Sequence, residues 1–173
     1  MFIYIHFKPA VQLRLCLGVS FHIMKTTLCY IEKDGKYLML FRNKKHSDVN
    51  EGKWVGVGGK FEPGESPEEC LIREVKEETG LTLTKYHFYG IVNFISDIWE
   101  NEEMYLYLGQ EFEGEISPDC NEGTLKWVDK SEVLSLPAWE GDRYFLSEML
   151  SGADKINLTL RYEGEELKEC QKG

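Results

Sequence analysis

Residues 59–81, with the sequence GKFEPGESPEECLIREVKEETGL, decide the fold of this chain. The stretch opens as a loop rich in glycine and proline and continues as the clearest helix of the sequence, over residues 66–79. Ser66 predicts the N-cap, because a serine followed three residues later by a glutamate, here Glu69, forms a capping box, and Pro67 suits the first turn. The glycine after the run is a typical helix stop. The stretch therefore predicts a loop, a helix and a second loop.

Three glutamates lie on one face of the predicted helix. Glu74, Glu77 and Glu78 are three and four residues apart, so their carboxylates project together. Other faces of the helix carry residues that can pack inward: Leu71, Ile72 and Val75. Like charges at this spacing destabilise an isolated helix, and a cation bound between them would offset the repulsion. Carboxylate oxygens suit Mg²⁺ or Mn²⁺ better than zinc. Taken alone, such a run is most often a solvated, salt-bridged helix face, so the surrounding positions decide its meaning.

The positions around these glutamates match the complete Nudix box, Gly-x5-Glu-x7-Arg-Glu-apolar-x-Glu-Glu-x-Gly-apolar. The fixed positions of the box are filled by Gly59, Glu65, Arg73, Glu74, Glu77, Glu78 and Gly80. The chain therefore resembles the Nudix hydrolases. The resemblance implies an α/β (α+β) architecture, the Nudix fold, in which a mixed β-sheet is sandwiched between helices and the box forms a loop-helix-loop. It also implies hydrolysis of a nucleoside diphosphate linked to another moiety, with Mg²⁺ as the cofactor and Mn²⁺ as a substitute.

The resemblance also implies a role for each position of the box. Glu74, Glu77 and Glu78 would bind the metal, joined by the carbonyl of Gly58, and Glu77 and Glu78 would take part in catalysis. The remaining positions would be structural and fix the loop against the helix: Gly59, Glu65, Arg73 and Gly80. Because the phosphates of a nucleotide are anionic, carboxylates alone would repel them. A bridging divalent ion neutralises that charge, polarises a phosphoryl oxygen and supplies a metal-bound water.

Residues outside the box resemble the MutT-like, 8-oxo-dGTP diphosphatase branch of the family. In that branch an acidic residue lies five positions before a strand tryptophan, and here Glu122 precedes Trp127 by that distance. The resemblance makes Glu122 the candidate for a fourth metal ligand or the general base. The alternative is an ordinary loop carboxylate. Three other acids compete for the same role: Glu100, Glu102 and Glu103.

A second group of residues bears on recognition of the base. In mammalian-type members of the branch, a tryptophan followed by two acids stacks on and reads the oxidised purine, and Trp139 and Asp142 match two positions of that motif. Gly141 replaces the first acid, and Val55 stands where the relative has a base-reading asparagine, so Asn93 is a candidate to take over that contact. The alternative for this motif is a buried tryptophan and an aspartate that caps a helix.

The substrate's phosphate tail needs a basic contact as well. Arg42 ends a predicted strand close to the glycine-rich strand before the box, and we expect it to bind phosphate. The lysines of the following loop, Lys44, Lys45 and Lys53, are rivals, each more often a solvated loop residue.

The rest of the chain predicts one domain of mixed α and β structure. Asp34 and Gly35 mark a hairpin turn. The predicted strands are 26–31, 37–42, 54–58, 85–96, 103–112, 125–128, 156–162 and 166–170, and the further helical segments are 129–134 and 142–150. Residues 24–173 are expected to form the Nudix domain. Residues 1–23 are expected to be an N-terminal extension, with Met24 as the natural start, and mass spectrometry of the native terminus would test this.

Length and charge set limits on the partners. The chain has 173 residues, which suits one domain, and 20 Lys and Arg against 30 Asp and Glu give a net charge of −10. Binding of a nucleic-acid polymer or of an anionic membrane needs a basic surface, so we expect neither partner. Five scattered cysteines without a Cys-x-x-Cys motif predict no disulfide framework and a location in the reducing cytoplasm. The oligomeric state stays open.

The resemblance and these limits together predict a Mg²⁺-dependent pyrophosphohydrolase. It would cleave a nucleoside triphosphate to the monophosphate and pyrophosphate, with an oxidised purine such as 8-oxo-dGTP as the preferred substrate. Another nucleotide, such as dihydroneopterin triphosphate or a nucleotide sugar, is the alternative substrate. A non-catalytic module that senses nucleotides is the alternative from another functional class.

Overall fold

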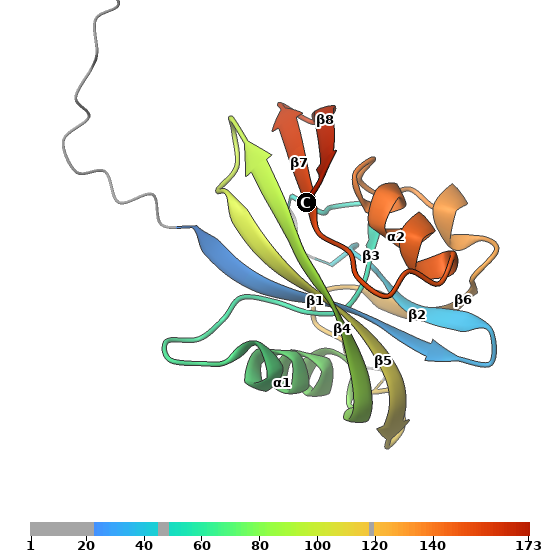
Figure 1. The fold of residues 1–173 in the computed structure, drawn as a ribbon. Coiled ribbons are helices and arrows are strands. Elements are labelled where there is room, and N and C mark those ends of the chain that lie inside the picture. Colours follow the sequence, from blue (N-terminus) through green and yellow to red (C-terminus); the bar gives the residue numbers. More distant parts are fainter. Residues whose placement is uncertain (1–22, 45–48, 118–119) are drawn as a thin grey trace, which may run out of the picture.

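The structure is a computed structural model and describes residues 23–44, 49–117 and 120–173 (Figure 1). The expected N-terminal extension, residues 1–23, lies outside the described residues except for Ile23, and Lys45 lies outside them as well.

The helix of the box forms as the sequence predicts. Helix α1 covers Pro67–Thr79, Ser66 is its N-cap, and the capping box is complete, with Glu69 bonding back to the Ser66 backbone at 2.9 Å. Gly80 ends the helix in the left-handed conformation, with φ 77°. The loop-helix-loop is therefore confirmed, and its two ends are set by local hydrogen bonds.

In the described part of the chain, eight strands form one mixed sheet in the order β3-β2-β1-β5-β4-β7-β8, with β6 paired to β2. Pairs β1–β5 and β4–β7 are parallel, and the other pairs are antiparallel. The strands are β1 (Met24–Lys33), β2 (Lys36–Phe41), β3 (Trp54–Val55), β4 (Thr82–Ser96), β5 (Glu102–Glu113), β6 (Thr124–Asp129), β7 (Leu158–Glu163) and β8 (Glu166–Lys172). The predicted hairpin is confirmed, because Asp34 and Gly35 both have positive φ angles, 49° and 75°, between β1 and β2.

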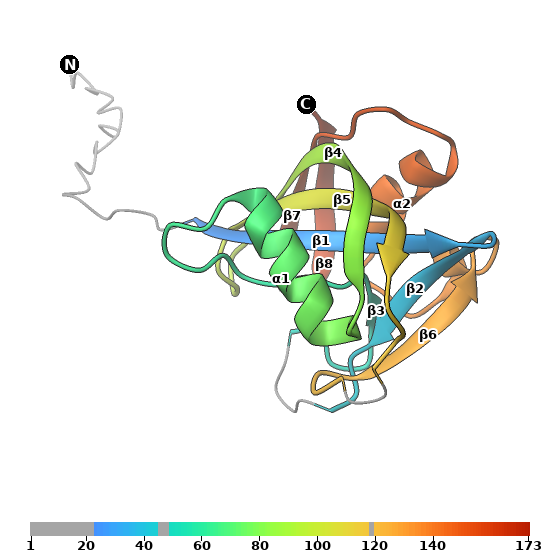
Figure 2. The same ribbon diagram turned by 90° about the horizontal axis from the view of Figure 1, so that it is seen from below.

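The two α-helices lie on opposite faces of the sheet. Helix α1 covers one face, and α2 (Asp142–Leu150) lies on the other side (Figures 1 and 2). Side chains of β1 alternate between the two cores: Tyr30 packs with the α2 residue Phe145, and its neighbour Ile31 packs with the α1 residue Leu71. The predicted architecture, a mixed sheet sandwiched between helices, is confirmed.

Two predicted segments are markedly shorter in the structure than the sequence predicts. The glycine-rich segment 54–58 is a strand only at Trp54–Val55, and the β1 backbone lies close against Gly56 and Gly58. A Cβ atom at Gly58 would lie 2.1 Å from the Thr27 carbonyl oxygen, so only glycine fits there. The helical segment predicted at 129–134 is a single 3₁₀ turn, η1 (Val133–Ser135).

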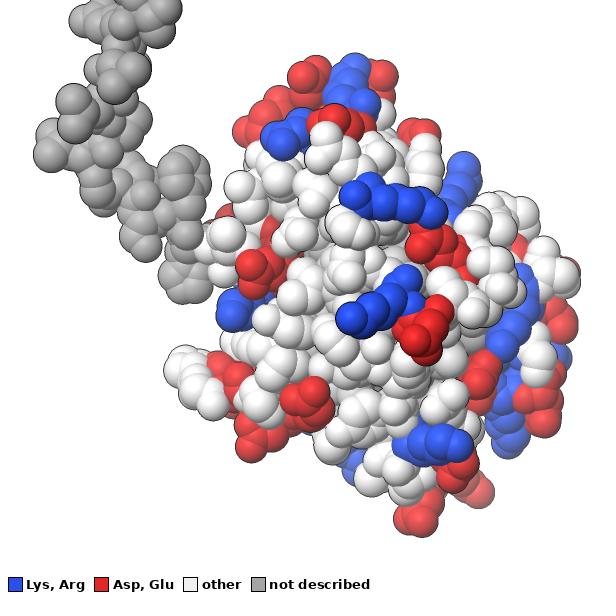
Figure 3. Space-filling view, viewed as in Figure 1, with Lys and Arg blue, Asp and Glu red and all other residues white. Residues whose placement is uncertain are grey.

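The surface and the cysteines agree with the composition. Lys and Arg are interspersed with Asp and Glu over the face seen in Figure 3. The four described cysteines, Cys29, Cys70, Cys120 and Cys170, are free thiols. In the described part of the chain, no helix has the length and apolarity needed to cross a membrane.

Candidate functional site

An arginine ties the loop before α1 to the helix. Arg73 donates hydrogen bonds from Nε and Nη2 to the two carboxylate oxygens of Glu65, each at 2.8 Å, and from Nη2 to the Lys60 carbonyl at 3.0 Å. Its Nη1 donates to Glu74 at 2.7 Å. Hydrogen bonding to Arg73 lowers the pKa of Glu65 to about 2. This bidentate ion pair therefore persists at neutral pH and fixes the loop against the helix.

Gly59 lets the loop pass directly over a box carboxylate. A Cβ atom at Gly59 would lie 2.4 Å from the Glu74 carboxyl carbon, far inside van der Waals contact. Any side chain at this position would displace Glu74 or the loop, so the glycine sets the place of that carboxylate.

Glu78 brings a buried carboxylate to the same loop. Its side chain is only 6% exposed, and Oε2 accepts a hydrogen bond from the Gly58 N–H at 2.8 Å. Oε1 is buried without a hydrogen-bond partner. Burial is the main cause that raises the pKa of Glu78 well above its ordinary range, and the carboxylates of Glu122 and Glu74 raise it further. The site thus holds a costly buried acid that a cation would stabilise.

Glu122 reaches this group from the loop before β6. Strand β6 pairs with β2 so that Thr124 lies opposite Phe41, which places Glu122 beside Arg42. Arg42 Nη1 donates a short hydrogen bond to Glu122 and lies 4.0 Å from Glu78 Oε1. The structure therefore brings Glu122 and Arg42 to the box, as the sequence predicts, but Arg42 pairs with carboxylates here.

The competing acids lie elsewhere. Glu102 and Glu103 stand at the start of β5, where Glu102 accepts a hydrogen bond from the Thr26 hydroxyl and Glu103 lies 3.9 Å from Lys25. Neither joins Glu74, Glu77 and Glu78, the box carboxylates on α1. Glu122 is the competitor that the fold places beside Glu78.

The four glutamates form a donor set that fits a hard divalent cation. Within the described residues, no three His, Cys, Asp or Glu side chains stand together in a geometry that could hold a metal ion. Arg42 and Arg73 form ion pairs with several of these acids. Arg73 lies 2.7 Å from Glu74 and 3.5 Å from Glu77, which is 61% exposed. Burial, followed by the charges of Glu77 and Glu122, also raises the pKa of Glu74 despite Arg73. Oxygen donors, one of them buried and unpartnered, are what Mg²⁺ or Mn²⁺ would take up.

Trp139 lies on the other face of the sheet, beside α2. Its side chain is 8% exposed and packs edge-on against Phe94 and Tyr162. The indole N–H donates to the Asn50 side chain at 2.8 Å, and the Lys53 ammonium lies 4.1 Å from the ring centroid. A base that stacks on this ring would therefore have to displace Lys53.

The motif after Trp139 is shaped by packing. Gly141 is the N-cap of α2 and makes no side-chain cap, so the alternative in which Asp142 caps the helix is wrong: Asp142 is its first residue. The Gly141 N–H donates to the Tyr162 hydroxyl at 2.8 Å, and a Cβ atom would lie 2.7 Å from that oxygen. An acid at this position would have to displace the side chains of Leu160 and Tyr162. Burial, followed by the charge of Glu102, raises the pKa of Asp142 to about 7, and Lys53 opposes the shift.

Sequence reasoning missed the partner of Asp142. Glu102 was considered only as a metal ligand, whereas its charge acts on Asp142. The signal was the alternation of β5, which puts residue 102 on the same face as Met104. Asn93 lies on the face of β4 opposite to its neighbours Val92 and Phe94, which pack with Trp139 and α2, and its contact with the base stays a prediction.

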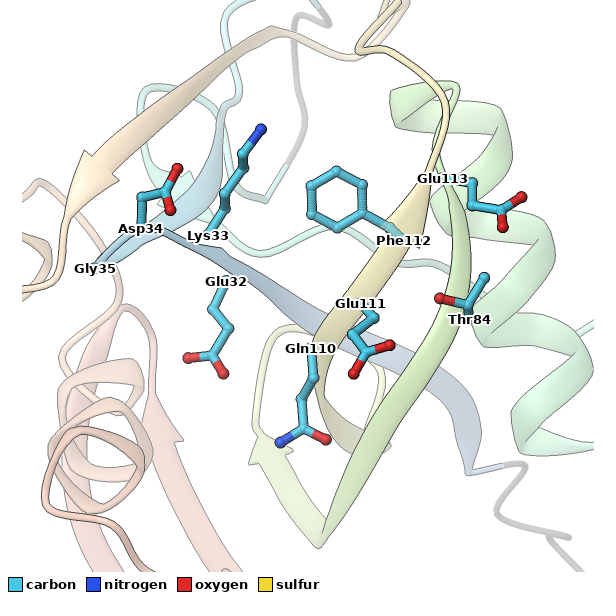
Figure 4. A pocket seen from close by; sticks show the side chains of 9 residues that line it. All are labelled: Glu32, Lys33, Asp34, Gly35, Thr84, Gln110, Glu111, Phe112 and Glu113. Carbon is cyan, nitrogen blue, oxygen red and sulfur yellow. The ribbon is translucent and has the colours of Figure 1, made fainter.

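A cavity opens at the end of the β1–β2 hairpin, away from the box glutamates and away from Trp139 and Asp142 (Figure 4). Its volume is about 690 Å³, and the side chains of Lys33 and Phe112 extend into it. The Lys33 ammonium lies 5.9 Å from the centroid of the Phe112 ring. None of the residues predicted for the site lines it.

Comparisons with known proteins agree with this geometry. The NUDIX domain family matches residues 23–149. The uncharacterised Nudix hydrolase YvcI of Bacillus subtilis is 30% identical over 148 residues, 83% of this chain and 90% of that protein. An oxidized purine nucleoside triphosphate hydrolase of Danio rerio is 30% identical over 126 residues, 72% and 78% of the two chains. The crystal structure of the MutT mutator protein of Bacillus halodurans superposes with a TM-score of 0.78 at 30% identity and covers 87% of this chain and 97% of that one. This chain belongs to the Nudix hydrolase family, and its fold is that of the MutT proteins.

Proposed function

We propose that this protein is a Mg²⁺-dependent pyrophosphohydrolase that cleaves a nucleoside triphosphate to the monophosphate and pyrophosphate. An oxidised purine nucleotide such as 8-oxo-dGTP is the preferred substrate, and the cytoplasm is the expected location. The observation that carries the proposal is the buried Glu78 carboxylate, with an unpartnered oxygen, beside Glu122 and Glu74. The Danio rerio relative is named for hydrolysis of oxidised purine nucleoside triphosphates, which supports the substrate.

One group of residues would bind the cation, and another would bind the phosphate. Glu74, Glu77, Glu78 and Glu122, with the Gly58 carbonyl, would hold the divalent ion. Once bound, that ion supplies charge neutralisation of the phosphates and activation of the attacking water. Mn²⁺ is expected to substitute for Mg²⁺ because both ions favour oxygen ligands.

Arg42 and the acidic residues around it bind the phosphate and accept the proton of the attacking water. When Glu122 turns toward the ion, the Arg42 Nη1 group that donates to it can donate to a phosphate oxygen instead. Glu122 either acts as the general base, which accepts the proton of the attacking water, or serves as the fourth metal ligand. In the second case a carboxylate of the box is the general base. Both versions keep Arg42 as the phosphate contact.

A second candidate is a Nudix hydrolase of another nucleotide, such as dihydroneopterin triphosphate or a nucleotide sugar. Two observations favour it: a side chain at Gly141 would have to displace Leu160 and Tyr162, and Val55 packs toward α1 rather than toward Trp139. A relative from Vibrio vulnificus, 27% identical over 131 residues, is named an NAD-capped RNA hydrolase, so capped RNA also belongs among the compounds to test. A non-catalytic sensing module is disfavoured, because every glutamate of the box is present.

The test is a substrate panel with detection of pyrophosphate or the monophosphate. We expect purified protein with Mg²⁺ to hydrolyse nucleoside triphosphates, with the highest kcat/KM on 8-oxo-dGTP, and Glu78→Gln to lower kcat by about three decades or more. Glu62→Gln, in the exposed loop before the helix, is the matched control and should retain activity. Failure of the wild-type protein to hydrolyse any compound would overturn the proposal. A higher kcat/KM on a pterin or a nucleotide sugar would establish the second candidate.

A further inference from the structure

Two residues just past the end of β2 hold residues 120–124, here called the Glu122 loop, at its two ends. At the start of the loop, Lys44 Nζ donates a hydrogen bond to the Cys120 carbonyl oxygen at 2.7 Å. At its other end, the Asn43 side-chain amide donates to the Thr124 hydroxyl at 3.1 Å. Lys44 and Cys120 are 76 residues apart in the chain, so no local pattern of sequence records this contact. The backbone on either side of Glu122 is therefore fixed to β2.

The Glu122 loop also packs closely on β2 through its own backbone. A Cβ atom at Gly123 would overlap the Phe41 carbonyl oxygen, so a side chain there would push the loop away from the strand. The Cys120 side chain is 3% exposed and packs in the core between the sheet and α1, together with Leu40. This packing and the two hydrogen bonds together set the region that the Glu122 side chain can reach.

The hydrogen bonds from Lys44 and Asn43 do not involve the Glu122 carboxylate. That carboxylate pairs with Arg42, whose Nη1 also lies 4.0 Å from Glu78 Oε1. In the proposed function, Glu122 turns from Arg42 toward the cation. Because the two hydrogen bonds use other atoms of the loop, they can persist while the ion pair opens. They then keep Glu122 beside Glu78 when Arg42 binds a phosphate oxygen.

The two hydrogen bonds differ in strength. The bond from the Lys44 ammonium is charge-assisted, and such bonds are roughly twice as strong as bonds between neutral groups. The bond between Asn43 and Thr124 joins two neutral groups. Lys44 is therefore the stronger attachment of the loop, and its loss should have the larger effect on Glu122.

We propose that Lys44 is a positioning residue, which holds the Glu122 loop so that Glu122 stays beside Glu78 during the reaction. Lys44 acts through Glu122 and contacts neither the cation nor the phosphates, unlike Arg42. Removal of a residue that orients a metal-site side chain typically lowers metal affinity or activity by about tenfold or more. The inference rests on the proposed function, because it concerns the acid that is assigned there as metal ligand or general base.

A double-mutant cycle between Lys44 and Glu122 tests the proposal. Lys44→Met removes the donor and keeps a side chain of similar shape, Lys44→Arg keeps a charged donor, and Glu122→Gln removes the acid's charge. Lys36→Met is the matched control, because Lys36 lies at the other end of β2 and pairs with Asp129. We would measure kcat and KM for the nucleotide that the wild-type protein hydrolyses best, and Mn²⁺ binding without nucleotide by calorimetry.

Lys44→Met should lower kcat and weaken Mn²⁺ binding, each by about tenfold, with KM little changed. Mn²⁺ binding should weaken because the Glu122 charge adds to the attraction for the ion in either of its roles. In the Glu122→Gln background, Lys44→Met should have almost no further effect, because the acid through which Lys44 acts has lost its charge. Lys44→Arg and Lys36→Met should behave like the wild-type protein.

Two results would overturn this inference and leave the proposed function intact. The first is an active Lys44→Met variant with unchanged kcat and unchanged Mn²⁺ binding. The second is a raised KM of equal size with and without Glu122→Gln, which would identify Lys44 as a phosphate contact. An inactive wild-type protein would overturn the proposed function, whereas Mn²⁺ binding that weakens in Lys44→Met, but not in Lys36→Met, would still support the positioning role.

Discussion

At the scale of single residues, the chain keeps several acids in positions that are unfavourable for the isolated fold. Glu78 and Asp142 are both buried enough to raise their pKa values, and each lies near another carboxylate. Such residues lower stability unless a ligand or a proton relieves them. Their cost is consistent with a binding role, because natural proteins tolerate local instability where a substrate or ion is bound.

The raised pKa of Asp142 predicts how the free energy of unfolding changes with pH. Its pKa of about 7 in the folded chain is above the ordinary value of 3.8, so between these values the folded state binds a proton that the unfolded state releases. Stability should therefore be full below about pH 4 and fall as pH rises towards 7. Asp142→Asn should remove the part of the decline that Asp142 causes and raise the free energy of unfolding at pH 8 by on the order of 1–2 kcal/mol. The part caused by Glu74 and Glu78, whose pKa values are also raised, should remain.

Urea unfolding at pH 4 and pH 8 would check this expectation. Asp154→Asn, at an exposed aspartate just beyond α2, is the control and should change neither value. A decline of equal size in Asp142→Asn and in the wild-type protein would show that Asp142 does not titrate in this window.

At the scale of elements, local chemistry explains what was predictable. The ends of α1 and the turn between β1 and β2 depend on contacts within a few residues, Ser66 with Glu69 and Asp34 with Gly35, and the sequence predicted them correctly. The pairing of Glu102 with Thr26, 76 residues away, depends on the parallel alignment of β1 and β5, which no local pattern records. The exclusion of a side chain at Gly141 likewise depends on Tyr162, across the α2 core.

The capping box of α1 is also testable as an element. Ser66→Ala removes the side-chain acceptor that the Glu69 N–H uses at 3.2 Å, and should lower the free energy of unfolding by about 1 kcal/mol. Ser66→Asp, which can cap in the same way, should restore most of the loss. Chemical denaturation followed by circular dichroism measures both. Equal stability of Ser66→Ala and the wild-type protein would mean that tertiary packing alone fixes this end of the helix.

At the scale of the whole molecule, the net charge is −10, and some of the acids that produce it could bind one cation together. The charge of Glu122, in the loop before β6, raises the pKa values of Glu74 and Glu78 in the box helix, although these two elements are far apart in the chain. A divalent ion bound between them would link these elements and stabilise the folded state alone, because the unfolded chain does not bring the acids together.

Mg²⁺ should therefore stabilise the whole fold, and Glu78→Gln should separate stability from activity. At a Mg²⁺ concentration of 100 times the Kd, the wild-type free energy of unfolding should rise by about 2.7 kcal/mol. In EDTA, Glu78→Gln should be at least as stable as the wild-type protein, because it removes a buried carboxylate of which one oxygen makes no hydrogen bond, yet it should lose most of the Mg²⁺-dependent gain. Thermal unfolding with and without Mg²⁺ measures both effects, and Glu111→Gln, an exposed partner of Lys85, is the control. A full Mg²⁺-dependent gain in Glu78→Gln would place the ion elsewhere, since the loss of a true ligand must weaken the link between ion binding and folding.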